Sequence, residues 1–144
     1  MLFEILGGYY LQRLGLQHTG EPVRGASATS FRFFAYIDPG SGTEADTRVT
    51  IGQQTDTAGN RYVLVYRDDN PSLRLFGPFR IDNNGLQVNC YDRNGNLTYT
   101  ASDIYSVEIG FRLVREGINV SSNSPLSITN YVFVKKFLFR KYYK

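Results

Sequence analysis

The sequence predicts a single α+β domain spanning residues 1–144, in which one N-terminal amphipathic helix packs on an antiparallel β-sheet of about six to eight strands. Three observations predict this class. Apolar residues recur at convincing helical spacing only over residues 1–17. Between residues 29 and 139, short segments alternate apolar and polar residues and are separated by turns rich in glycine, proline and asparagine. Aromatic residues make up 15% of the chain, and together with many Val, Ile and Thr they favour β-structure.

The predicted helix covers residues 1–17 and carries one apolar stripe. The positions at three- and four-residue steps are Leu2, Ile5, Leu6, Tyr9, Tyr10, Arg13, Leu14 and Gln17. The adjacent glycines 7 and 8 weaken this helix by roughly 1 kcal/mol each. Because a helix of this length is marginal in isolation, we expect its stripe to pack on one face of the sheet.

The predicted strands occupy most of the remaining chain. Residues 18–28 form a loop, since two glycines and a proline interrupt them. Strands are then predicted over residues 29–37, 48–54, 61–67, 73–81, 86–91, 97–100, 107–114 and 128–139. The segment 86–114 is the predicted centre of the sheet, because two strongly alternating stretches flank the Asn94-Gly95 reversal. Short turns between consecutive strands indicate antiparallel pairing.

Composition excludes several functional classes. The net charge is only +3, so no chain-wide positive field indicates nucleic-acid binding. No run reaches the roughly 18 consecutive apolar residues of a transmembrane helix, and the first residues do not resemble a signal peptide. The single cysteine, Cys90, lies in the apolar phase of its strand and is expected to be a small buried hydrophobe. His18, the single histidine, lies in a loop without an evident partner.

No familiar catalytic motif is present. Nucleotide-binding, zinc-protease and nucleophile-elbow sequences are all missing, so we expect no enzyme activity, no metal and no cofactor. Two turns, residues 38–44 and 92–96, carry clustered oxygen ligands that invite a calcium test, although neither has the spacing of an EF-hand loop. A hydrolase with paired carboxylates stays open, because any two acidic residues can meet in the folded chain.

Several strings resemble the minor pilins and pseudopilins of type IV pili and type II secretion, most closely the pseudopilin J branch. They are residues 8–16 (GYYLQRLGL) at the end of the helix, residues 30–38 (SFRFFAYID), the turn in residues 88–96 and the run at residues 103–109 (DIYSVEI). The resemblance implies a pilin-like fold and a non-catalytic structural subunit of a bacterial pilus, competence or secretion filament. It further implies a cell-envelope location and an apolar helix half, absent from this chain, that anchors the subunit in the inner membrane.

Under this interpretation the partners are other pilin or pseudopilin subunits. The stripe residues predicted to form the subunit interface are Leu2, Ile5, Leu6, Tyr9, Tyr10 and Arg13. The exposed loops 43–46 and 116–127 are further places for partner contact. A basic, aromatic tail over residues 140–144 keeps DNA binding open without supporting it.

The alternative interpretation is a carbohydrate- or ligand-binding β-domain. It predicts a concave aromatic cluster in place of a helix-backed sheet. The residues proposed for that cluster are Tyr62, Tyr66, Tyr91 and Tyr99, although packing would also explain them.

Overall fold

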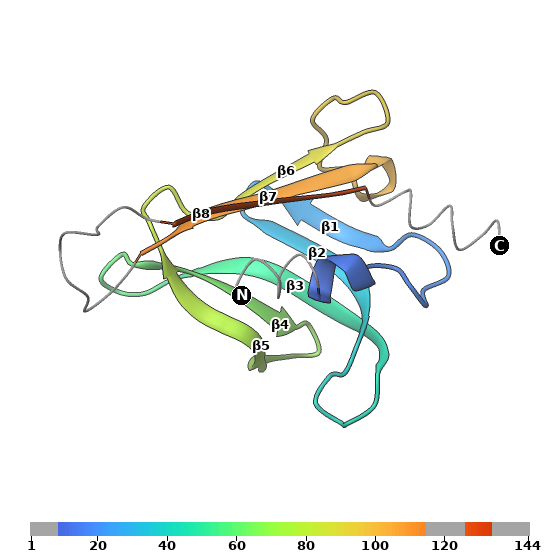
Figure 1. The fold of residues 1–144 in the computed structure, drawn as a ribbon, viewed down its shortest axis with the longest axis horizontal. Coiled ribbons are helices and arrows are strands. Elements are labelled where there is room, and N and C mark those ends of the chain that lie inside the picture. The colour runs from blue at the N-terminus through green and yellow to red at the C-terminus, as the bar shows by residue number, and fades with distance from the viewer. Residues whose placement is uncertain (1–8, 115–125, 134–144) are drawn as a thin grey trace.

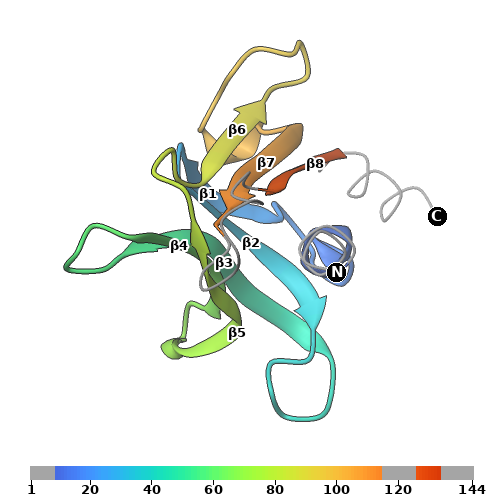
Figure 2. The ribbon, with the colours of Figure 1, turned by 60° about the vertical axis from the view of Figure 1, so that its left-hand side comes forward.

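The computed structural model describes residues 9–114 and 126–133, which form an antiparallel β-structure. Its strands are β1 (Val23–Ser27), β2 (Ser30–Ile37), β3 (Ala45–Thr55), β4 (Arg61–Arg67), β5 (Asn70–Ile81), β6 (Gln87–Tyr91), β7 (Ser106–Leu113) and β8 (Leu126–Phe133). Two 3₁₀ turns, η2 (Leu11–Arg13) and η3 (Ala101–Asp103), lie within the described residues. The β6–η3 connection and the β2–β3 loop project from opposite ends of the molecule (Figures 1 and 2).

All eight strands belong to one sheet. Its order is β1-β2-β3-β4-β5-β7-β6, and β8 pairs with β7. The first five strands form a meander, because each is joined to the next by a short reversal. The sheet curls until it nearly closes: the N–H of Val88 in β6 donates to the carbonyl oxygen of Ala28, just after β1, at 2.9 Å. Figure 2 shows β6 and β1 approaching each other.

The predicted α+β class is wrong, because no helix lies across the sheet within the described residues. Residues 1–8 of the predicted helix lie outside them, and from residue 9 the chain forms only a short turn around η2. Leu14 then pairs with Ala35, and the N–H of Gly15 donates to the carbonyl oxygen of Phe34 at 2.8 Å. The 3₁₀ turn ends at Arg13, Leu14 is already extended with φ −62° and ψ 122°, and pairing to β2 satisfies the main chain instead.

Two further sequence predictions need correction. The stretch predicted as a loop, residues 18–28, contains β1, which pairs along β2 with an irregularity between Val23 and Gly25. The strand predicted over residues 97–100 is reduced to a single bridge between Leu97 and Tyr91. The predicted strand 128–139 is represented by β8, and its residues beyond 133 lie outside the described chain.

The concave side of the sheet holds the hydrophobic core. Alternate residues of β2 face inward, as the alternation predicts: Phe31, Phe33, Ala35 and Ile37 are fully buried. Other large, fully buried side chains are Leu11, Leu14, Val49, Ile51, Val63, Val65, Ile81, Leu86 and Ile104. The apolar residues around η2 therefore pack into this core, as part of the stripe was expected to do, but without forming the helix.

Candidate ligand-binding groove

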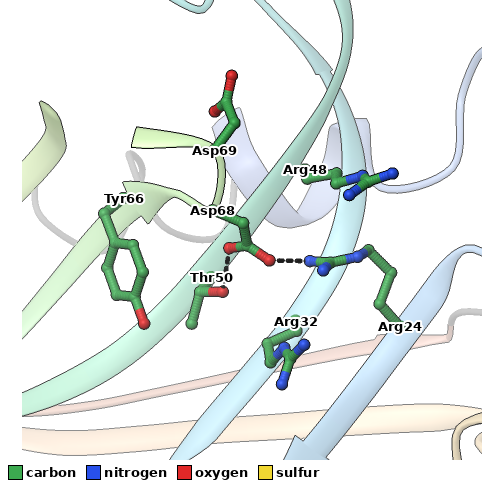
Figure 3. Close-up of a pocket in the computed structure, with 7 residues that line it drawn as sticks. All are labelled: Arg24, Arg32, Arg48, Thr50, Tyr66, Asp68 and Asp69. Atoms are coloured by element: carbon green, nitrogen blue, oxygen red, sulfur yellow. Dashed lines mark hydrogen bonds and ion pairs between the residues drawn. The ribbon is translucent and has the colours of Figure 1, made fainter. Parts of the chain in front are cut away.

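A hollow of about 420 Å³ lies on the outer face of the sheet over β1–β4. Its lining residues are Arg24, Arg32, Arg48, Thr50, Tyr66, Asp68 and Asp69 (Figure 3). We call this surface the arginine groove. Strand pairing builds it, because Arg32 on β2 lies opposite Thr50 on β3, and Thr50 lies opposite Tyr66 on β4. Side chains in such a row point to the same face of a sheet.

Asp68 organises the centre of the groove. One carboxylate oxygen accepts a hydrogen bond from the Thr50 hydroxyl at 2.5 Å, and the other forms an ion pair with Nη1 of Arg24. The N–H of Asp68 donates to the carbonyl oxygen of Arg48 at 3.2 Å, which fixes this carboxylate beside β3. The side chains of Arg24 and Asp68 are each only 17% exposed, so their attraction is less screened than that of a surface pair.

Asp69, the second aspartate of the groove, forms an ion pair with Arg67, which does not line the groove. Arg67 donates to both carboxylate oxygens of Asp69, from Nε at 3.0 Å and from Nη2 at 2.5 Å. These bonds lower the pKa of the Asp69 carboxyl, which is therefore ionised at neutral pH. Arg67 is held in turn by donating to the carbonyl oxygen of Pro39 at 2.9 Å.

Arg32 and Arg48 differ from the other arginines of the groove. Both are exposed, and in the described part of the chain neither guanidinium has an acidic partner or a hydrogen bond. Figure 3 shows the guanidinium of Arg24 between those of Arg48 and Arg32, where it points toward Asp68. The groove therefore contains one arginine fixed by an aspartate and two that retain their full donor capacity.

An aromatic pair borders the groove. The His18 ring stacks on Phe34 with 3.7 Å between centroids and 12° between planes, and His18 Nδ1 lies 2.7 Å from a carboxylate oxygen of Asp46. The guanidinium of Arg24 lies 5.8 Å from the centroid of the Phe34 ring. Arg24 is thus held by Asp68 and by a cation–π contact. No local pattern indicated a partner for His18, because Asp46 lies 28 residues away.

The four tyrosines of the proposed aromatic cluster are not gathered in one site. Of these, Tyr66 alone lines the groove. Tyr62 donates to a carboxylate oxygen of Asp56 at 2.9 Å, and Tyr99 donates to the carbonyl oxygen of Val88 at 2.6 Å. Tyr91 lies in β6, on another part of the sheet.

The residues predicted for a subunit interface fall in different environments. Leu2, Ile5 and Leu6 lie outside the described residues. Tyr10 is 5% exposed and donates to the carbonyl oxygen of Leu75 at 3.0 Å, so its side chain belongs to the core. Tyr9 packs edge-on against Tyr10, with the Arg13 guanidinium 4.7 Å from the centroid of the Tyr9 ring. Arg13 also forms an ion pair with Glu44, in one of the predicted contact loops, at 2.5 Å. The second such loop, 116–127, lies almost wholly outside the described residues, as does the basic tail.

The candidate reactive groups have structural roles. Cys90 is fully buried as predicted, and burial raises the pKa of its thiol to about 12, so it is not a thiolate nucleophile at neutral pH. In the two turns considered for calcium, an oxygen of Asp38 accepts main-chain hydrogen bonds from Gly40, Ser41 and Gly42, and Asp92 accepts two in the same way. Within residues 9–114 and 126–133, no group of three or more His, Cys, Asp or Glu side chains is placed to hold a metal ion.

The chain matches no protein-family model, no curated protein and no solved structure. The pilin-like family, role and location therefore stay predictions that these comparisons do not test. Over the described residues, no helix has both the length and the apolar character needed to cross a membrane.

Sequence reasoning did not identify the groove, although part of its signal was present. The alternation of β2 and β4 assigned Arg32 and Tyr66 to the faces opposite Phe31 and Val65. Had the meander order been assumed as well, these residues would have been expected on one surface. The ion pair from Arg24 to Asp68 spans 44 residues and has no local sequence signal.

Proposed function

We propose that this chain is a non-catalytic binding domain that holds an anionic ligand in the arginine groove. The observation that carries the proposal is the pair of exposed arginines, Arg32 and Arg48, which lack a polar partner within the described residues. Arg24 lines the same groove but is already paired with Asp68. Guanidinium groups donate in a planar fork that matches carboxylates, sulfates and phosphates. The hollow of about 420 Å³ lies within the range of roughly 300–1,000 Å³ that is usual for small-ligand sites.

The relation between Arg32 and Arg48 suits a shared anion. Thr50 lies directly opposite Arg32, and Arg48 precedes Thr50 by two residues on the same strand. Such diagonal neighbours have Cα atoms about 7–8 Å apart, and long side chains can reach each other across that distance. Two guanidinium groups can therefore converge on one anionic group without any movement of the strands.

The chemistry of the groove favours binding over catalysis. Both aspartates are held as ion pairs by arginines, Asp68 by Arg24 and Asp69 by Arg67. A general acid needs a carboxyl that is protonated near neutral pH, whereas the hydrogen bonds from Arg67 lower the pKa of the Asp69 carboxyl. The paired-carboxylate hydrolase therefore still ranks below the binding interpretation.

The pilin-like role is placed second here for a physical reason. Its distinguishing expectation was a helix laid across an antiparallel sheet, and residues 9–17 form no such helix. The ligand-binding alternative predicted a concave aromatic cluster, and its four tyrosines are not gathered in one site. Tyr66, one of the residues named for it, borders the arginine groove.

The proposal is tested by titrating the full 144-residue chain with citrate and following the arginine side-chain NMR signals. We expect the Nε–Hε resonances of Arg32 and Arg48 to shift in a saturable way that weakens as NaCl is added. The Arg32→Gln/Arg48→Gln variant should lose binding by at least about tenfold, because hydrogen bonds to charged groups contribute about 1.5–3 kcal/mol each.

Arg93→Gln is the matched control, since it removes one positive charge from an exposed residue of the distant turn after β6. It should bind citrate as the parent does. Shifts that do not saturate, or that are equal at Arg93 and in the groove, would refute the proposal.

A further inference from the structure

The groove contains an aromatic ring, Tyr66, as well as positive charge. Tyr66 contributes no aromatic stacking or cation–π contact in the described part of the chain, and its hydroxyl has no hydrogen-bond partner there. Gly52 on β3 is a diagonal neighbour of Tyr66 on β4. A Cβ added to Gly52 would lie 3.6 Å from a Tyr66 ring carbon. The half-buried Tyr66 ring therefore lies against the buried main chain of Gly52, and position 52 places no side chain over the ring.

We infer that the ligand is an acidic carbohydrate, whose carboxylate or sulfate binds Arg32 and Arg48 while a sugar ring packs on Tyr66. The inference rests on the proposed function and names its ligand class. An aromatic ring presents a flat apolar surface with a polar tip, which suits the apolar C–H face of a sugar and one of its hydroxyls. Arginine supplies donors in the geometry that carboxylate and sulfate groups accept.

The mixture of charges separates this ligand from a nucleic acid. The groove lining combines three arginines with two aspartates, so its net charge is only one positive unit. A polyphosphate chain would pass close to the carboxylates of Asp68 and Asp69, whereas sugar hydroxyls can donate hydrogen bonds to them. Nucleic-acid sites also combine basic tracks with several free stacking platforms. Here Phe34, the ring beside Arg24, is already stacked on His18.

The position of Tyr66 relative to the arginines sets the size of the ligand. Tyr66, Thr50 and Arg32 form one row across three neighbouring strands, which lie about 4.7–4.9 Å apart. The Tyr66 and Arg32 strands are therefore separated by about 10 Å. A sugar that reaches both sites must span about that distance, which favours an oligosaccharide over a single small anion.

The test compares the full chain with four labelled probes: an oligogalacturonate, a heparin oligosaccharide, neutral dextran oligomers and short polyglutamate. Polyglutamate carries carboxylates without sugar rings, and dextran carries sugar rings without charge. We expect at least one of the two acidic sugars to bind about tenfold more tightly than polyglutamate and dextran. Preference for oligogalacturonate identifies the anionic group as carboxylate, and preference for heparin identifies it as sulfate.

Tyr66 provides the decisive variants. Tyr66→Ala should weaken binding of the preferred acidic sugar by about fivefold while citrate binding changes less than about twofold. Tyr66→Phe keeps the ring and should retain most of the sugar affinity, which separates stacking from any general effect of the alanine on folding.

The outcomes distinguish the two proposals. Equal binding of polyglutamate and acidic sugars, with no effect of Tyr66→Ala, would overturn the carbohydrate inference and leave the anion-binding function intact. Tighter binding of a single-stranded DNA oligonucleotide than of either acidic sugar would overturn it in favour of a nucleic-acid ligand. Loss of saturable binding for every anion, citrate included, would overturn both proposals.

Discussion

Replacement of Asp68 by asparagine or alanine tests whether this carboxylate organises the groove. The carboxylate accepts from the Thr50 hydroxyl at 2.5 Å and pairs with Arg24, and the side chains of the pair are each 17% exposed. A hydrogen bond to a charged group contributes about 1.5–3 kcal/mol, and an exposed ion pair only about 0–1 kcal/mol. Since this pair is mostly but not fully buried, an intermediate value is expected.

Asp68→Asn retains an oxygen for Thr50 but loses the charge that attracts Arg24. We expect its free energy of unfolding to fall by about 1–2 kcal/mol. Asp68→Ala also leaves the Thr50 hydroxyl, on a residue only 3% exposed, without its acceptor, so the loss should reach about 3 kcal/mol.

Urea denaturation of the two variants, and a double-mutant cycle of Asp68→Asn with Arg24→Met, measure these values. The same variants have an opposite expected effect on binding. Without the Asp68 charge, Arg24 is free to join Arg32 and Arg48, so citrate should bind more tightly to Asp68→Asn than to the parent chain. A change in stability below about 0.5 kcal/mol for Asp68→Ala would refute the reasoning, because that is the size of an ordinary surface substitution.

Three further predictions concern the sheet and its core. Burial raises the pKa of the Cys90 thiol from 9.0 to about 12, so above about pH 9 only the unfolded chain ionises this thiol. The free energy of unfolding should therefore decline as pH rises above about 9. In urea denaturation at a series of pH values, Cys90→Ala should reduce this decline. Gly77→Ala should lower the free energy of unfolding by about 3 kcal/mol, because φ is +79° and the new Cβ would lie 2.7 Å from a main-chain oxygen. Gly59→Ala, with φ +89° and open space around the new Cβ, should lower it by about 1 kcal/mol in the same assay. Leu11→Ala should lower the thermal midpoint through a loss of about 2–5 kcal/mol since Leu11 is fully buried, and the exposed Gln12→Ala should leave it unchanged.

Strand positions were the most predictable feature of this protein, and the reason is local. The predicted strand over residues 61–67 has the same limits as β4, and the one over residues 29–37 differs from β2 by one residue. The segment 29–37 alternates and the segment 61–67 is a short apolar run, and each is bounded by residues that favour turns. The burial of Cys90 followed from the same alternation.

The helix prediction failed because periodicity does not distinguish a helix from another way of burying the same residues. Tyr10 and Leu14 of the predicted stripe are buried, but so is Leu11, which lay outside the stripe, so the stripe identified only some of the residues that enter the core. Their conformation was decided instead by pairing to the part of β2 that extends beyond β1, where Leu14 forms its bridge to Ala35. Tertiary hydrogen bonding therefore overrode local helical preference.

β1 was missed for a related reason. Gly25 and the neighbouring polar residues reduce intrinsic strand preference, and Gly20 and Pro22 suggested a loop. The segment is extended because its main chain pairs with β2, which no local pattern reveals. Since Arg24 lies on this strand, the same omission hid the arginine groove.

The groove lies on strands whose opposite face forms the hydrophobic core, and this governs how it can bind. Behind the row Arg32, Thr50 and Tyr66, the opposite faces of the same strands carry fully buried core residues such as Phe31 and Ile51. Strand positions therefore need no adjustment on binding, whereas the exposed Arg32 and Arg48 side chains must be ordered, at a cost of about 0.5–1.5 kcal/mol each. A single small anion offers few contacts to offset this cost. A ligand that engages both arginines and Tyr66 in one molecule offsets it with additional contacts, and so the geometry favours an extended acidic ligand over an isolated ion.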